Sequence, residues 1–265
     1  MSAAKRKGLE VVTEFSVSEA LAGKRILLTG ATDFVGKVAL SMLLTRFPEI
    51  ETIYVMARPG VSTSAEERFF GKVVVAPPFD PLRAKLGAGF DDFVRKKCEP
   101  VAGDVSREWC GFSDEVLERL QGKVDLIINS AGLVDFAPTL EAGLNANAAG
   151  AVNVARTASR LGAKLVHVST CFVAGDRPGY VMEEEELVGY FPKREDRPDE
   201  EFDPFAEIED CRASIARIKE QANDKALLSE FRAKAAARLR EEGRDDRVAR
   251  ALRVGAMRER KLWVS

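Results

Sequence analysis

The sequence predicts an α/β protein with a doubly wound parallel sheet, strand order 3-2-1-4-5, followed by a charged α-helical appendage. Two observations carry this prediction. Short β-branched runs alternate with longer amphipathic patterns over the first 175 residues, which is the rhythm of βαβ units. A glycine-containing turn joins the first such run directly to the first amphipathic pattern, as in sheets that bind ligands at the carboxyl ends of their strands.

Five strands and three long helices make up the predicted sheet domain. Each predicted helix ends near a glycine, a proline or a basic residue, as helix C-termini commonly do. Residues 61–97 contain prolines at positions 77, 78 and 81, so we expect a loop with one short helix there. The predicted strands are residues 25–29, 52–57, 98–102, 124–129 and 164–169, and the predicted helices are residues 35–46, 114–121 and 139–161.

Composition narrows the class of protein. Of 265 residues, 46% are hydrophobic, enough for one main core, and 40 basic residues against 42 acidic ones leave a net charge of −2, so nothing requires nucleic acid as a partner. No apolar run approaches the roughly 20 residues of a membrane helix and no signal peptide is visible, so we expect a cytoplasmic protein. Four widely spaced cysteines and a single histidine predict neither a disulfide framework nor a metal site.

The composition changes after the sheet domain. Residues 181–204 hold ten acidic and three basic residues, whereas residues 205–265 hold eleven acidic and fifteen basic ones. We therefore divide the chain into four parts. These are an N-terminal extension (1–20), the sheet domain (21–176), an acidic surface segment (177–204) and the helical appendage (205–265).

The appendage shows helical periodicity. Apolar residues recur at three- and four-residue spacing from Ile215 to Leu239, with one longer step, which predicts one helix with an apolar stripe. A turn at residues 241–244 separates it from a second helical pattern that carries Val248, Leu252 and Met257. The excess of arginine and lysine allows a peripheral contact with a membrane surface or nucleic acid. The mixed signs of the charges favour a solvated helical pair that packs its stripe on the sheet domain.

The turn after the first strand has the clearest chemical meaning, and its sequence is T-G-A-T-D-F-V-G. Glycines there let the backbone turn tightly and approach a pyrophosphate, whose charge meets the N–H groups and dipole of the following helix. Lys37 is followed by Val38, not by the Ser or Thr of a P-loop. We therefore predict that residues 21–176 form a dinucleotide-binding Rossmann domain whose loop comprises Thr29, Gly30, Thr32, Asp33, Phe34, Val35 and Gly36.

Two charged residues refine this prediction. Asp33 stands where a glycine is expected, and a carboxylate about 4 Å from a pyrophosphate costs on the order of 1 to 4 kcal/mol per charge pair. Alternatively, Asp33 caps the helix with its carboxylate, so in either case we expect weakened cofactor affinity.

Arg58 lies 22 residues after Gly36, where an NAD-binding domain usually has an acid. Its guanidinium suits a 2′-phosphate, so we expect NADPH, although a plain surface arginine is the alternative.

Further strand ends carry polar residues. Gly103-Asp104-Val105 follows the third strand, Asn129-Ser130-Ala131-Gly132 follows the fourth, and His167-Val168-Ser169-Thr170 ends the fifth. Ligands bind at this edge of parallel sheets. We expect His167 to be a packed strand residue without a partner, on the pleat face opposite Thr170.

These strings together resemble the extended short-chain dehydrogenase/reductase superfamily, and within it the fatty acyl-CoA reductases. The resemblance covers about residues 20–176. It implies the NADPH-dependent reduction of long-chain acyl-CoA or another acyl thioester to an aldehyde or alcohol. The strings that carry it are G-K-R-I-L-L-T-G-A-T-D-F-V-G-K-V, I-Y-V-M-A-R, G-D-V, L-N-A-N-A-A-G-A-V-N-V and V-H-V-S-T-C-F-V-A-G.

The resemblance also implies roles for individual residues. Thr170 would be the catalytic Ser/Thr, whose hydroxyl can bond the thioester carbonyl and favour the growing oxyanion, and Asn147 would be the active-site helix asparagine. A threonine at a strand end can instead bond nearby backbone. The other implied positions are Gly30, Asp33 and Gly36 for the pyrophosphate, Arg58 for the 2′-phosphate, Asp104, beside Val105, for the adenine, and Asn129, Ala131 and Gly132 for the cofactor cleft.

The family also uses a tyrosine followed four residues later by a lysine, as proton donor and as the cation that lowers its pKa. Tyr54, Tyr180 and Tyr190 are followed at that spacing by arginine, glutamate and arginine. We therefore expect the N-terminal part of a longer enzyme, inactive as a chain ending at Ser265. Three alternatives stay open. They are a reductase of carrier-protein thioesters or a sugar-nucleotide epimerase, a non-enzymatic NADP-binding protein, and an interaction or membrane-surface module. The sequence predicts no oligomeric state.

Overall fold

The computed structural model describes residues 15–135, 137–174, 179–184, 202–243 and 249–264. The chain forms two compact units. The first, which we call the sheet unit, comprises Met1–Ala131 and Asn153–Val168, and the second, the helical unit, comprises Gly132–Val152 and Ser169–Ser265. Most of the predicted acidic surface segment lies outside the described residues; Glu183 and Glu184 are exposed.

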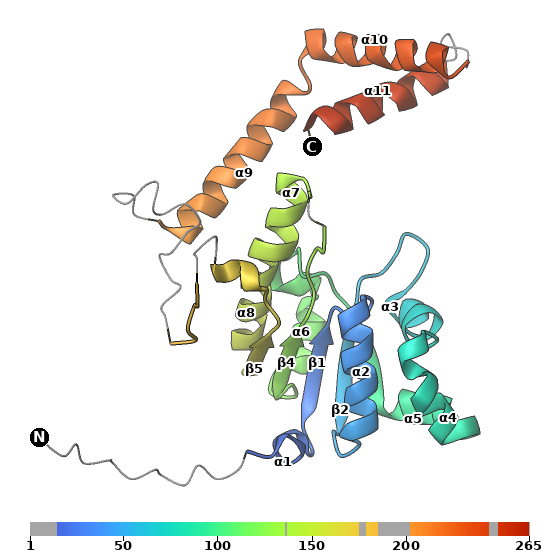
Figure 1. Ribbon diagram of the computed structural model, residues 1–265, viewed down its shortest axis with the longest axis vertical. Coiled ribbons are helices and arrows are strands. Elements are labelled where there is room, and N and C mark those ends of the chain that lie inside the picture. The colour runs from blue at the N-terminus through green and yellow to red at the C-terminus, as the bar shows by residue number, and fades with distance from the viewer. Residues whose placement is uncertain (1–14, 136, 175–178, 185–201, 244–248, 265) are drawn as a thin grey trace, which may run out of the picture. The chain divides into compact units, whose positions relative to one another are not determined.

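The sheet unit contains five parallel strands in the order β3-β2-β1-β4-β5, which confirms the predicted order (Figure 1). The bounds of the first three strands are those predicted. β4 begins at Leu126, two residues late, and β5 ends at His167, two residues early. The strands are β1 Arg25–Thr29, β2 Thr52–Ala57, β3 Cys98–Ala102, β4 Leu126–Asn129 and β5 Lys164–His167.

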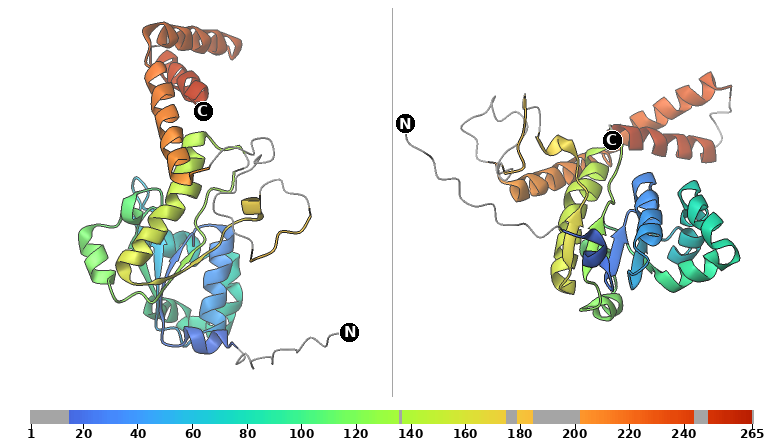
Figure 2. Two further views of the ribbon diagram at one scale, coloured as in Figure 1. Left: turned by 90° about the vertical axis from the view of Figure 1, so that its left-hand side faces the viewer. Right: turned by 60° about the horizontal axis from the view of Figure 1, so that its bottom comes forward.

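Alternate residues of the central strands bury opposite faces of the sheet. Ile26 and Leu28 of β1 join a cluster with α2 (Phe34–Arg46) and the segment between β2 and β3. Leu27 and Ile127 join a second cluster with α6 (Asp114–Leu120) and the sheet-unit part of α8 (Ala149–Leu161). Figure 2 shows these helices on the two faces of the sheet. Burial on both faces explains why the strands are nearly continuous apolar runs.

The outermost described strand, β5, differs from the others because all four of its residues are exposed. Before β1, the chain forms a short helix, α1 (Val17–Leu21), whose N-cap is Ser16.

The segment between β2 and β3 is helical, so the prediction of a loop with one short helix is wrong. Pro78 and Pro81 lie in the first turns of their helices, where a missing N–H costs nothing, and Ser64 forms a capping box with Glu67. The prolines therefore start helices here and do not break them. The segment comprises α3 (Ala65–Arg68), a π-helical turn (Phe69–Val73), a 3₁₀ turn (Pro77–Phe79), α4 (Asp80–Leu86), a second 3₁₀ turn (Gly87–Gly89) and α5 (Phe90–Lys97).

The helix predicted over residues 139–161 contains a π-helical turn. Thr139 caps α7 (Leu140–Gly143) by accepting a hydrogen bond from the Ala142 N–H at 3.1 Å. The π turn spans Leu144–Ala148 and leads into α8. Such turns often mark functional sites in helices, and this one contains Asn147.

The appendage has a helix break that the sequence analysis placed wrongly. The structure has α9 (Pro204–Gln221), α10 (Lys225–Glu241) and α11 (Ala249–Val264), so the single helix predicted from Ile215 to Leu239 is two. The break falls in the one longer step of the apolar stripe, and the Asp224 carboxylate caps α10 by accepting from the Ala226 N–H at 2.8 Å. No described helix is long and apolar enough to cross a membrane.

Helices α10 and α11 lie side by side and form a hairpin, which we call the α10–α11 hairpin (Figure 1). Phe231, Ala235 and Leu239 of the stripe are buried, and Arg238 of α10 pairs with Glu259 of α11 at 2.7 Å. This part of the stripe therefore packs within the helical unit, and the predicted packing on the sheet domain is wrong for it.

Candidate cofactor site and active-site residues

The turn between β1 and α2 has room only for glycine at two positions. Gly30 has a φ of 75°, and a Cβ added to it would lie 2.6 Å from the Ala131 nitrogen. A Cβ on Gly36 would lie 2.1 Å from the Gly30 carbonyl oxygen. Because these neighbours are backbone atoms, they cannot move aside as a flexible side chain would. The first turn of α2 therefore packs directly on the end of β1, as the glycine pattern predicted.

The amino end of α2 is open to an anion. The first N–H groups of a helix have no carbonyl partner within it. Asp33 occupies the N-cap position, but its carboxylate makes no capping hydrogen bond, so the predicted capping role is wrong. Asp33, Phe34 and Val35 are exposed, and Thr32 is half-buried. The geometry therefore combines an open helix N-terminus with one nearby carboxylate.

A row of polar side chains crosses the carboxyl ends of three strands. The parallel register aligns Thr29 with Asn129 and Asn129 with His167. The Thr29 hydroxyl donates to the Asn129 Oδ1 atom, which also accepts from the Ala131 N–H at 3.2 Å. The Asn129 Nδ2 atom lies 2.7 Å from His167 Nδ1. Since the amide oxygen accepts, Nδ2 is the donor and His167 Nδ1 is the acceptor, which leaves the imidazole proton on Nε2.

This row corrects the expectation for His167, which is exposed and hydrogen-bonded, neither packed nor without a partner. Thr29 and Asn129 are each only 1% exposed. Ser130 adds a bond from its hydroxyl to the Thr29 carbonyl at 2.9 Å. The network fixes the segment from Asn129 to Ala131, which is the backbone that lies against Gly30.

The ends of β2 and β3 bring Arg58 close to Asp104. The Arg58 Nη1 atom lies 3.8 Å from the Asp104 Oδ2 atom, and the Arg58 side chain is 68% exposed. The other Asp104 oxygen accepts from the Ser106 N–H at 3.0 Å and the Ser106 hydroxyl at 2.7 Å. Val105 is half-buried, and its carbonyl accepts from the Asn153 side chain at 2.9 Å. Asp104 is therefore held in place while the Arg58 guanidinium stays available.

A strained turn supports Asp104 from the chain that follows it. Trp109 and Cys110 have φ values of 53° and 57°, in the left-handed region that non-glycine residues rarely adopt. The Cys110 carbonyl accepts from the Asp104 N–H at 2.7 Å. Strain of this kind persists only where the surroundings enforce it. The turn thus fixes the Asp104 backbone at the carboxyl end of β3.

Arg68 was not predicted to belong to the site. Its Nη1 atom donates to the Arg58 carbonyl at 2.6 Å, and its Nε atom is buried without a hydrogen-bond partner among the described residues. Arg68 ends α3, inside the segment that the sequence analysis treated as mostly loop. The capping pair Ser64 and Glu67 was the signal that could have revealed this helix and its basic last residue. Two guanidinium groups therefore flank the end of β2.

The predicted active-site residues lie in the helical unit. The Asn147 Oδ1 atom accepts from the Leu133 N–H at 2.7 Å, and its Nδ2 atom donates to the Leu133 carbonyl at 3.1 Å. Gly132 packs beside it, since a Cβ added there would lie 3.4 Å from Asn147 Oδ1. The π turn of Asn147 is thus tied to the chain that leaves β4.

Thr170 is exposed, and its Oγ1 atom accepts from the Phe172 N–H at 3.1 Å. This is the backbone bond that the sequence analysis considered as the alternative to a catalytic role. The two are compatible, because a hydroxyl oxygen that accepts a bond keeps its own proton to donate. The described bonding therefore leaves the Thr170 hydroxyl able to donate to a carbonyl oxygen.

Comparison with known proteins bears on these residues. The family described as "Male sterility protein", whose model is that of an NAD-binding domain, matches residues 28–253. The chain belongs to this family. The match supports binding of a nicotinamide dinucleotide by the sheet unit. It also confirms the kinship that the sequence strings predicted.

Relatives of the chain include fatty acyl-CoA reductases. Fatty acyl-CoA reductase 1 of Arabidopsis thaliana is 35% identical over 167 residues, which cover 62% of this chain and 34% of the relative. The alcohol-forming fatty acyl-CoA reductase of Simmondsia chinensis is 32% identical over 178 residues, covering 66% and 36%. The chain therefore spans about one third of the length of these relatives.

A solved structure with a similar fold is the terminal R domain from the myxalamid PKS-NRPS biosynthetic pathway. Its TM-score is 0.51 at 28% identity, over 63% of this chain and 40% of that one. This likeness agrees with the strand order and the doubly wound architecture of the sheet unit.

Proposed function

We propose that this chain is the nucleotide-binding part of an NADPH-dependent reductase that converts long-chain acyl-CoA thioesters to aldehydes or alcohols. The observation that carries the proposal is the β1–α2 turn. Its two glycines admit close approach to the open N-terminus of α2, where an anion is stabilised by about 0.3 to 1 kcal/mol at an exposed site. A pyrophosphate there places the rest of a dinucleotide along the carboxyl ends of the strands.

The choice of NADPH over NADH rests on the two arginines at the end of β2. Arg58 is exposed, and Arg68 donates to the Arg58 carbonyl and so holds the backbone at this point. An exposed guanidinium suits the dianionic 2′-phosphate that only NADPH carries. The Asp104 Oδ2 atom lies beside this guanidinium, 3.8 Å from the Arg58 Nη1 atom.

On the substrate side, the dinucleotide supplies the hydride when it is bound, and the chain positions the acceptor. The Thr170 hydroxyl keeps a proton that can stabilise negative charge on a thioester carbonyl oxygen. Asn147 acts through the backbone, because both ends of its amide bond Leu133. The proton donor is not assigned, since no tyrosine in the sequence is followed four residues later by lysine.

The test is a calorimetric titration of the chain with NADPH and with NADH. Replacing Arg58→Gln removes a hydrogen-bonded charge worth about 1.5 to 3 kcal/mol, so NADPH affinity falls roughly ten- to hundredfold while NADH affinity stays the same. Arg68→Gln is expected to act in the same direction. Arg46→Gln, an exposed arginine at the other end of α2, is the matched control and leaves both affinities unchanged.

Two results would count against the proposal. Equal affinity for NADPH and NADH in the unmodified chain removes the 2′-phosphate argument, and no binding of either removes the dinucleotide site. The substrate class is tested separately, by adding a long-chain acyl-CoA, a carrier-protein thioester or a sugar nucleotide to the NADPH complex. Only the acyl-CoA is expected to change the heat of binding.

A further inference from the structure

The α10–α11 hairpin is strongly basic. Its two helices contain ten basic and three acidic residues, a net charge of +7, whereas α9 has a net charge of −1. Because charges farther apart than about 8 to 10 Å are screened at physiological salt, this local excess acts on a nearby partner although the whole chain is nearly neutral. The hairpin therefore presents a positive surface of its own.

A groove of about 360 Å³ lies between the two helices of the hairpin. Its apolar lining comes from Leu228 and Phe231 of α10 and from Ala256 and Met257 of α11. Met257 is 67% exposed, and Val254, one turn before it on α11, is 60% exposed. Large apolar side chains thus stand open at the groove and on the helix beside it.

Three arginines border this groove, namely Arg232, Arg253 and Arg260. Arg260 bonds neutral oxygens, the Ala222 carbonyl at 3.2 Å and the Asn223 side chain at 2.8 Å. Among the residues that the structure describes, no carboxylate lies within ion-pair distance of any of the three. The groove therefore combines three guanidinium groups with an apolar floor.

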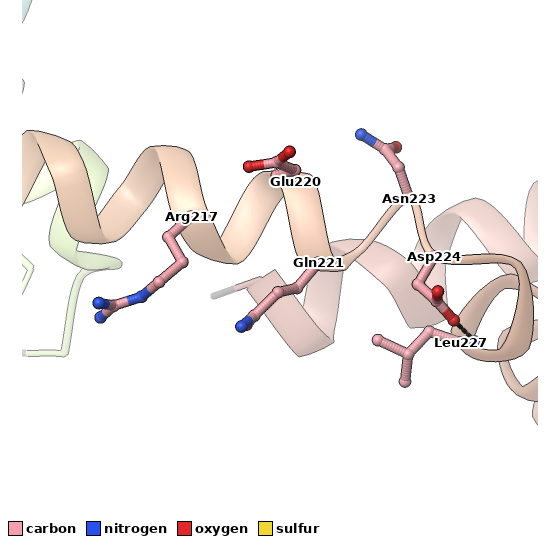
Figure 3. A pocket seen from close by; sticks show the side chains of 6 residues that line it. All are labelled: Arg217, Glu220, Gln221, Asn223, Asp224 and Leu227. Atoms are coloured by element: carbon pink, nitrogen blue, oxygen red, sulfur yellow. Dashed lines mark hydrogen bonds between the residues drawn. The ribbon is translucent and has the colours of Figure 1, made fainter.

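The hollow at the junction of α9 and α10 has the opposite character (Figure 3). Its lining includes Arg217 together with the acids Glu220 and Asp224, so its charges are mixed. The Asp224 carboxylate is already used as the helix cap, and Figure 3 shows its bond to Leu227. Arg217 is thus an exposed arginine of the same unit that does not border the groove, which makes it a suitable control.

We propose that the α10–α11 groove docks on the surface of a membrane that contains anionic phospholipids. Arg232 and Arg253 bind lipid phosphates, and Met257 and Val254 insert among the upper acyl chains, because cationic and apolar groups on one surface are the combination that interfacial helices use. Nucleic acid is the poorer occupant, since phosphate binding alone gives no role to the exposed Met257. This docking involves only the hairpin and is independent of the proposed reductase activity.

The test is cosedimentation of the full chain with vesicles of phosphatidylcholine alone or mixed with phosphatidylserine. Binding is expected only to the mixed vesicles and is expected to weaken as salt rises. The double substitution Arg232→Gln with Arg253→Gln lowers the partition coefficient by about thirtyfold, since each basic residue near such a surface contributes about 1 kcal/mol. Arg217→Gln leaves binding unchanged.

Further measurements distinguish a membrane from free phosphate and from nucleic acid as the ligand of the groove. Met257→Asn is expected to weaken vesicle binding about tenfold, through lost burial of the side chain. Inorganic phosphate at the lipid phosphate concentration should not compete, whereas full competition identifies a phosphate site and overturns the membrane assignment. Equal binding to neutral vesicles, or tight binding to duplex DNA that Met257→Asn does not alter, also overturns it. Circular dichroism spectra and thermal unfolding of each variant confirm an intact fold independently of the lipid result.

Discussion

The β1–α2 turn and the α10–α11 groove both offer an anion a positive site, but by different physical means. At the turn, backbone shape determines the site, because a Cβ on Gly30 or Gly36 would collide with backbone atoms and the amino end of α2 is exposed. At the groove, positive charge and exposed apolar surface determine the site, because three arginines border exposed apolar side chains. The first arrangement suits one ligand in one pose, and the second suits a fluid surface with many equivalent phosphates.

The largest effect is expected from Gly36→Ala. The new Cβ would lie 2.1 Å from the Gly30 carbonyl, so the turn must shift, which costs about 3 kcal/mol and removes NADPH binding. Gly71→Ala is the matched control, since nothing lies within 4 Å of a Cβ there. Urea unfolding and NADPH titration measure both variants. Equal stability of the two would show that shape does not control the turn.

A slightly smaller effect is expected from Asn129→Ala. The substitution leaves the Thr29 hydroxyl without its acceptor and leaves the Ala131 N–H with only the Thr29 hydroxyl oxygen, at 3.3 Å. Because Thr29 and Asn129 are each 1% exposed, the expected cost is about 2 to 3 kcal/mol of unfolding free energy. Asn153→Ala removes a single part-buried bond to Val105 and should cost about 1 kcal/mol. Similar urea midpoints for the two would contradict the idea of a coupled row across the strands.

The role of charge at the turn is tested by Asp33→Gly. Since the carboxylate makes no capping bond, glycine costs only a few tenths of a kcal/mol in helix stability. Removing a charge about 4 Å from a pyrophosphate in a water-like setting gains about 1 kcal/mol, or roughly fivefold tighter NADPH binding. Unchanged affinity means that the carboxylate points away from the phosphates. Raised salt should narrow the difference between the two proteins.

The smallest effect concerns the pair Arg25 and Asp125 at the amino ends of β1 and β4. The Arg25 side chain, through its hydrogen bond, lowers the pKa of the Asp125 carboxyl, whose Oδ2 atom also accepts from the Arg25 N–H at 2.8 Å. The stabilisation is therefore full above the unfolded pKa of about 3.9 and is lost as pH falls through the folded value. Asp125→Asn should lower stability by less than about 1 kcal/mol at pH 7 and flatten its acid dependence. An unchanged acid limb of the urea midpoint would contradict this.

Local signals were enough to predict much of the sheet unit. The bounds of β1 to β3 and the glycine turn follow from periodicity and from residues that only one backbone shape accepts. The strand order follows from the doubly wound topology that such a turn implies. The row from Thr29 to His167 was not predictable in the same way, because it depends on the register between strands about 40 and 100 residues apart in sequence. Here the partners of each side chain are set by strand pairing and not by its sequence neighbours.

The other errors have local causes. Prolines within the first turn of a helix were taken for loop signals, and this hid Arg68 beside Arg58. In the appendage, the longer step in the apolar stripe marked a helix end, and the Asp224 cap was the residue that could have placed it. Arg58 and Asp104, predicted separately from two strand ends, do lie together.

The exposure of strand β5 has a consequence for work with the purified protein. Leu165 and Val166 are 37% and 52% exposed, on the outermost described strand of the sheet. An uncovered apolar strand is a template on which another chain can add its own, so aggregation that rises with concentration is the expected hazard. A lysine at Val166 would act as a gatekeeper and improve solubility without touching the glycine turn.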